Sequence, residues 1–96
     1  MFVILLKFSE NKNKAGEFMD GHNQWIQQGF QEGIFLLAGS LQPNLGGSVI
    51  AHNISLSELE ERVKKDPFVK ENIVTSEILE IDPKKTDARL NFLVEK

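Results

Sequence analysis

The sequence has no cysteine among its 96 residues, which excludes disulfide bonds, a thiolate nucleophile and cysteine-ligated zinc. Histidine is scarce, because only His22 and His52 are present and neither has the spacing of a metal-binding motif. Gly46-Gly47 lacks the lysine and the spacing of a phosphate-binding loop. We therefore expect no metal and no organic cofactor.

Long hydrophobic runs and an excess of positive charge are also missing. The apolar start of the chain ends at Lys7, which is too early for a signal sequence or a membrane span. The net charge is −3 and no basic patch follows any face, so neither nucleic acid nor membrane is an expected partner. Without an export signal, a cytoplasmic location is expected.

The apolar content of 41% and charged content of 26% are typical of one small globular domain. Six segments have the apolar spacing and the turn residues of strands and helices. The order is strand, helix, strand, strand, helix, strand: Phe2–Phe8, Ala15–Gly33, Ile34–Leu41, Ser48–Ile54, Ser55–Lys65 and Ile73–Ile81. This βαββαβ order predicts an α+β, ferredoxin-like fold, with a four-stranded antiparallel sheet and two helices on one face. The domain is expected at 1–83, followed by a C-terminal extension at 84–96.

Two of the predicted strands are apolar on both faces. Residues 2–6 and 34–38 lack the alternation of a sheet with one face in water. Two helices can cover only one face, so we expect a homodimer through the open sheet face. The alternative is that the apolar patch of the extension, Leu90 to Val94, folds back over that face.

The first helix carries a histidine on its apolar side. Steps of three and four residues from Ala15 reach Phe18, Met19, His22 and Trp25. A buried imidazole without a partner costs about 1–3 kcal/mol, so a hydrogen-bond partner is expected. His22 is either a core histidine or a general acid or base, a task for which histidine is the commonest residue type.

Asp66 follows the second helix and has two interpretations. It can cap the short turn that begins at Pro67, and it can be the partner of His22. Both hold together, because a carboxylate has several acceptor sites. The two helices run antiparallel in this fold, which brings the end of the second near the start of the first. We therefore expect His22 and Asp66 within hydrogen-bonding reach, with Phe68 buried beside them.

Gly39 and Ser40 near the end of the second strand mark either a bulge or the approach of a ligand, to which Ser40 can donate a hydrogen bond. No nucleophile elbow surrounds Ser40, so a serine hydrolase is not expected. His52 is interpreted as an exposed or edge histidine.

The helix histidine, "EGIFLLAGSL", the Gly-Gly hairpin and "DPFVKENIVTSEILEIDP" together resemble the YciI-like (YCII-related) family over residues 2 to about 83. The resemblance implies subunits that pair as dimeric α/β barrels, with His22 and Asp66 as a catalytic pair. One type of member is a dehydrochlorinase acting on a chlorinated hydroxyquinol, and muconolactone isomerases and small monooxygenases share the fold. Family members often carry an arginine where this chain has Phe18 and Met19, and Gly-Pro where it has Gly39-Ser40.

The sequence therefore predicts an acid–base enzyme of the lyase, isomerase or dehydrochlorinase type, acting on a small cyclic or aromatic compound. The catalytic residues are expected to be His22 and Asp66, and the substrate-binding residues Phe18, Met19, Trp25, Gly39, Ser40 and Phe68. The alternative is a non-catalytic dimeric module that binds a small ligand or regulates a partner.

Overall fold

The computed structural model describes residues 1–94, which form four strands and three α-helices. None of the described helices is both long and apolar enough to cross a membrane. The elements are β1 (Phe2–Phe8), a 3-10 turn η1 (Lys12–Lys14), α1 (Ala15–Gln31), β2 (Phe35–Leu41), β3 (Gly46–Ala51), α2 (Leu56–Lys64), α3 (Pro67–Lys70), β4 (Val74–Glu80) and η2 (Ala88–Leu93).

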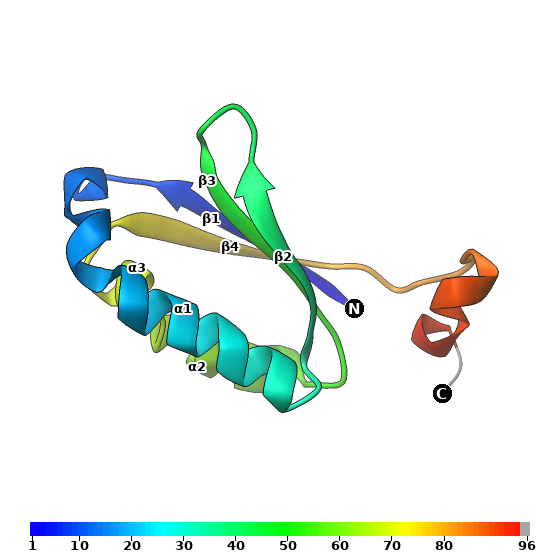
Figure 1. Cartoon of the computed structure of the whole chain (residues 1–96). Coiled ribbons are helices and arrows are strands. Elements are labelled where there is room, and N and C mark those ends of the chain that lie inside the picture. The colour runs from blue at the N-terminus through cyan, green and yellow to red at the C-terminus, as the bar shows by residue number, and fades with distance from the viewer. Residues whose placement is uncertain (95–96) are drawn as a thin grey trace.

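The four strands form one antiparallel sheet in the order β2-β3-β1-β4. All three α-helices lie on the same side of this sheet, with α1 and α2 side by side (Figure 1). This arrangement confirms the predicted ferredoxin-like α+β fold, with α3 as a short addition after α2. Ser55 caps α2 through the predicted capping box with Glu58.

The core lies between the sheet and the helices. Phe2, Ile4 and Leu6 of β1 are buried, because alternate side chains of a strand point to the same face. α1 packs closely on β2 at Gly29, where a Cβ would lie 2.2 Å from the ring of Phe35. Glycine is therefore needed at this crossing.

The third strand begins and ends earlier than predicted, so that Gly46 lies in it and His52 follows its end. A Cβ on Gly46 would lie 2.0 Å from the carbonyl oxygen of Leu6, and its φ is +128°. Only glycine allows β3 to pair with β1 at this point. Gly46 and Gly47, which were expected to precede the third strand, are therefore its first two residues. The turn between β2 and β3 lies at 42–45.

After β4 the chain leaves the sheet, and residues 84–94 project away from the helices and strands (Figure 1). They touch the domain through a ring contact between Phe92 and His52, with centroids 5.5 Å apart. Leu90, Phe92 and Val94 nevertheless remain exposed. Residues 84–94 do not cover the open sheet face, contrary to the alternative considered from sequence.

Candidate functional site

His22 and Asp66 are in direct contact, although α1 carries one and the start of α3 the other. The imidazole Nδ1 lies 2.8 Å from Asp66 Oδ1. Since a carboxylate only accepts hydrogen bonds, Nδ1 is the donor in this pair. The ring nitrogen Nε2 is left for other chemistry, and it makes no hydrogen bond within the described chain. The two side chains are 13% and 0% exposed, so the contact is largely shielded from water.

Asp66 is fixed by its position as the N-cap of α3. Its Oδ1 also accepts a hydrogen bond from the backbone N–H of Phe68 at 3.0 Å, and Pro67 occupies the first helical position. Both interpretations from sequence therefore hold for the geometry: the carboxylate caps a helix and contacts His22. Its other oxygen, Oδ2, is buried and has no hydrogen-bond partner among residues 1–94.

α1 approaches α3 closely at Gly21, directly before His22. A Cβ at Gly21 would lie 3.1 Å from Cγ of Pro67, directly after Asp66. Because glycine has no side chain, the two backbones come near enough for the imidazole to reach the carboxylate.

Phe68 holds the face of the imidazole. The two rings are parallel within 1°, with centroids 3.9 Å apart. Phe68 is itself buried, so its ring has little freedom to move. His22 is thus oriented at one edge by Asp66 and on one face by Phe68.

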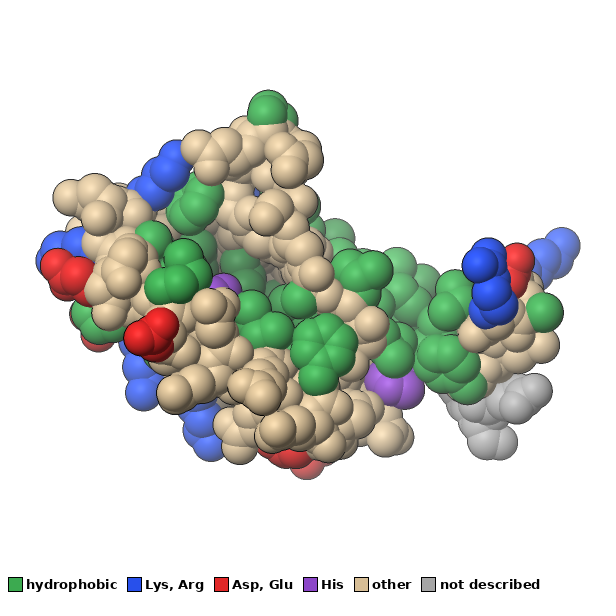
Figure 2. Space-filling view, viewed as in Figure 1, with side chains coloured by type: hydrophobic (Ala, Val, Ile, Leu, Met, Phe, Trp, Pro, Cys, Tyr) green, Lys and Arg blue, Asp and Glu red, His purple; other side chains and the backbone are tan. Residues whose placement is uncertain are grey.

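The imidazole lines a cavity of about 330 Å³ between α1 and the sheet. Figure 2 shows a hollow beside the β2–β3 hairpin, with hydrophobic side chains around it and a histidine in it. The lining residues come from α1, α3 and all four strands: Leu6, Phe8, Met19, His22, Asn23, Ile26, Ala38, Gly39, Ser40, Gly46, Gly47, Ser48, Val49, Phe68 and Val74. A cavity with apolar walls and a histidine nitrogen suits proton transfer on a small ligand.

Of the six predicted substrate-binding residues, the structure brings four to this cavity: Met19, Gly39, Ser40 and Phe68. Phe18 packs against the core instead. Trp25 turns toward α2, because its indole N–H donates to the carbonyl oxygen of Arg62 at 2.9 Å.

Asn23 and Ile26 also line the cavity and were not predicted to do so. Ile26 lies on the apolar stripe of α1, where core packing is the ordinary expectation, and Asn23 lies on the polar side beside that stripe. The spacing of Met19, Asn23 and Ile26, at i, i+4 and i+7, is the signal that identifies them as one edge of the helix. The strand residues of the lining carry no comparable signal, since their neighbours depend on strand register.

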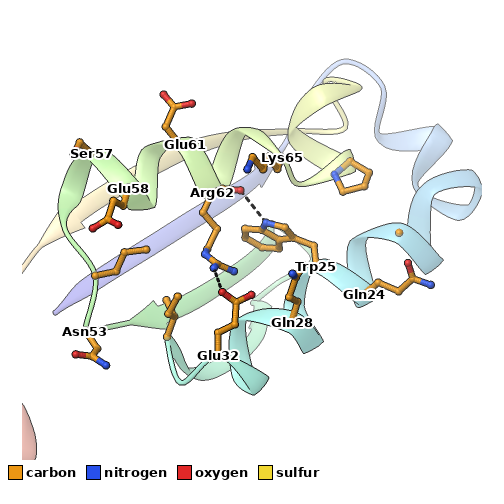
Figure 3. Close-up of a pocket in the computed structure, with 14 residues that line it drawn as sticks. Gln24, Trp25, Gln28, Glu32, Asn53, Ser57, Glu58, Glu61, Arg62 and Lys65 are labelled. Carbon is orange, nitrogen blue, oxygen red and sulfur yellow. Dashed lines mark hydrogen bonds and ion pairs between the residues drawn. The ribbon is translucent and has the colours of Figure 1, made fainter.

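A second, wider hollow of about 990 Å³ lies between α1 and α2. Figure 3 shows Trp25 at its base and the side chains of Arg62 and Glu32 meeting across it. The two are joined by a 2.6 Å ion pair. Its other labelled side chains are mostly amides and charged groups (Figure 3). The ion pair and the indole hydrogen bond join α1 to α2, so the polar groups in this hollow have a structural role.

No group of three or more histidine, aspartate or glutamate residues in the described part of the chain could hold a metal ion.

The sequence matches the family model of the YCII-related domain over residues 1–82, so the chain belongs to the YCII-related family. This confirms the resemblance noted from sequence. A search of curated proteins gave no match.

A similar solved structure is the 5-chloro-2-hydroxyhydroquinone dehydrochlorinase TftG from Burkholderia phenoliruptrix AC1100, in complex with 2,5-dihydroxybenzoquinone. The TM-score is 0.67 and the sequence identity 13%, with 84% of this chain and 93% of that chain covered. At this identity the likeness extends to the fold.

Proposed function

We propose that this protein is a small acid–base enzyme that transfers a proton on a cyclic or aromatic compound bound beside His22. The observation that carries the proposal is the 2.8 Å contact between His22 Nδ1 and Asp66 Oδ1 at the wall of a cavity. Membership of the YCII-related family and a dehydrochlorinase of the same fold support it.

In the proposed reaction, Nε2 of the neutral imidazole takes a proton from a hydroxyl group or an activated carbon of the bound compound. The Asp66 carboxylate, hydrogen-bonded to Nδ1, stabilises the imidazolium that results. In an isomerisation the proton returns to another atom of the same compound. In an elimination it leaves together with the departing anion, such as chloride. Asp66 acts through His22 and is therefore a positioning residue.

A panel of hydroxyquinols, lactones and halogenated aromatic compounds tests the proposal, with conversion followed by absorbance and chloride release. His22→Gln is expected to lower the rate about 10²- to 10⁴-fold, the usual contribution of a positioned acid or base. His52→Gln is the matched control, because His52 lies outside the cavity. Equal rates for wild type and His22→Gln would rule the proposal out.

A non-catalytic ligand-binding module is the second candidate. The mostly apolar lining and the rigid hold on His22 by Asp66 and Phe68 also suit a site that only orients a ligand. Tight binding of a panel compound without conversion would favour this candidate.

We also propose that the protein acts as a homodimer through the open sheet face. Strand register aligns one apolar side chain from each strand in a row on that face: Leu37, Ile50, Val3 and Leu79. Leu37 and Leu79 are 56% and 44% exposed in the single chain. A second copy covers such a row most simply, since it presents the same surface. The cytoplasmic location stays a prediction from sequence.

A further inference from the structure

The cavity beside His22 carries no formal charge of its own. Of its lining residues, all within the described chain, none is lysine, arginine, aspartate or glutamate. A carboxylate that enters such a cavity loses water and meets no lysine or arginine among the lining residues, which is unfavourable while the imidazole is neutral. An uncharged ligand has no such penalty.

Charged residues near the cavity also disfavour an anionic ligand. Asp66 lies directly behind His22, so a ligand anion would face a second carboxylate through the imidazole. Glu17 and Asp20 precede His22 on α1 and are exposed near Met19, which lies at the cavity wall. The whole chain carries a net charge of −3. These negative charges repel an anionic ligand. The ammonium group of Lys12, 4.6 Å from the ring centroid of the lining residue Phe8, offsets part of that repulsion.

Two polar side chains of the lining are available to a ligand. Asn23 on α1 and Ser40 on β2 are exposed, and neither side chain hydrogen-bonds to any residue that the structure describes. The Ser48 hydroxyl, in contrast, donates to the carbonyl oxygen of Ile4 at 2.9 Å. An amide and a hydroxyl can each donate to a ligand oxygen or accept from a ligand hydroxyl.

The cavity is large enough for a compound of one ring. At about 330 Å³ it lies at the small end of ligand cavities. Its apolar walls, including Phe8, Ile26 and Val74, suit the faces of a ring.

We propose that this cavity selects uncharged, oxygen-bearing rings over carboxylates, and that Asn23 and Ser40 bind the ring oxygens as specificity-determining residues. The inference rests on the proposal that the His22 cavity is the functional site, and it adds the class of compound that enters.

Calorimetric titration of the wild-type protein under anaerobic conditions tests the charge preference. The probes are methyl-substituted catechol, resorcinol and hydroquinone, each paired with the compound in which a carboxylate replaces the methyl group. The best methyl compound is expected to bind at least about tenfold more tightly than its carboxylate counterpart. Absence of binding by all methyl compounds, or equal binding of the two members of a pair, would overturn the inference.

A gain of function provides the sharper test. Met19 is 40% exposed at the cavity wall, so a longer side chain fits there without disturbing the core. Met19→Arg is expected to raise affinity for the carboxylate compound about tenfold or more, through a charge-assisted hydrogen bond, without a matching gain for the methyl compound. Met19→Gln, polar but uncharged, is the control and should give no such gain. An equal gain with glutamine, or none with arginine, contradicts selection by charge.

Asn23→Leu and Ser40→Ala test the two polar groups. Each is expected to weaken binding of the best methyl compound about threefold to tenfold, the effect of losing one neutral hydrogen bond. Gln27→Leu, on the same helix but outside the cavity lining, should leave binding unchanged. If Asn23→Leu and Ser40→Ala also leave binding unchanged, these residues do not determine specificity.

These measurements separate the inference from the proposed function, because binding is read without turnover. A methyl compound that binds as expected but is never converted sustains the inference and contradicts the enzyme. Carboxylates converted as efficiently as uncharged rings, with dependence on His22, sustain the enzyme and contradict the inference.

Discussion

His22 is held by two different kinds of contact, which leave one nitrogen for chemistry. Asp66 binds Nδ1 at the edge of the ring and Phe68 stacks on its face. Asp66 and Phe68 belong to one tripeptide, so a single short turn defines both the direction and the tilt of the imidazole. Such support from neighbouring side chains is what a proton-transferring group requires to stay in reach of its substrate.

Asp66→Asn should separate catalysis from stability. Asparagine is an equally good helix cap, and its amide oxygen can still accept from the Phe68 N–H. The amide nitrogen replaces Oδ2, which already has no partner in the described chain. We expect a fall in kcat of about 10²-fold and a loss of less than about 1 kcal/mol in the free energy of unfolding, because only the charge that stabilises the imidazolium is lost.

Steady-state kinetics and thermal denaturation measure the two effects. Asp66→Ala is the comparison, since it also removes the cap and should cost about 1 kcal/mol or more of stability. A large fall in melting temperature for Asp66→Asn with unchanged kcat would assign the carboxylate a structural task alone.

At the scale of elements, the site depends on how closely α1 approaches α3. Gly21 and Pro67 form that contact, one residue away from His22 and Asp66 respectively. The geometry of the proposed site is therefore sensitive to the spacing of α1 and α3.

Gly21→Ala should reduce activity without a comparable loss of stability. The added methyl group would sit 3.1 Å from Pro67 Cγ, so α1 and α3 have to separate by a few tenths of an ångström. Alanine raises helix propensity by up to about 1 kcal/mol, which offsets the crowding. We expect kcat to fall about tenfold, because small misplacements of a catalytic group are costly.

Gly16→Ala is the matched control for this prediction. No atom lies within 4 Å of a Cβ at Gly16, so the same exchange on the same helix meets open space. An equal effect of the two exchanges on kcat, measured under identical conditions, would refute the link between helix spacing and catalysis.

The elements were largely predictable from sequence, because apolar periodicity and turn residues reflect local physics. The third strand was misplaced by two residues at its start, since nothing local reveals that Gly46 must pass close to the Leu6 carbonyl. The contact between His22 and Asp66 followed from antiparallel helices. The direction of the Trp25 side chain could not be predicted, because it depends on the Arg62 carbonyl of α2, which only the assembled fold brings near.

At the scale of the molecule, the two faces of the sheet differ in how they are covered. Helices bury one face, whereas Val3, Ile50 and Leu79 lie in a row on the other. Residues 84–94 lie to one side of the sheet and cover neither face (Figure 1).

Leu79→Glu should dissociate the proposed homodimer. The exchange puts a charge into the apolar row, and its burial in an interface raises the dissociation constant by about 100-fold or more. Leu56→Glu is the control, because Leu56 is 42% exposed on α2, away from the sheet face. Light scattering should give twice the 10.9 kDa chain mass for wild type and for Leu56→Glu, and the single mass for Leu79→Glu. A wild-type protein of single mass would exclude the homodimer.

Truncation after Pro83 tests whether the domain is independent of its extension. Residues 84–94 contribute nothing to the buried core, and Phe92 makes a ring contact with His52 of the domain. We expect a loss of less than about 1 kcal/mol, which corresponds to less than about 8 °C in melting temperature for a domain of this size. A truncated chain without cooperative unfolding would place the extension within the domain.

The position of Trp25 beside His22 has a practical consequence. The chain has one tryptophan and no tyrosine, and the indole centroid lies 6.2 Å from that of His22. Near-ultraviolet emission from this protein therefore comes from essentially one position, next to the ring that we propose does the chemistry. A change in the charge of that ring alters the environment of a built-in fluorophore, so unlabelled protein can report on its own site during a titration or a stopped-flow experiment.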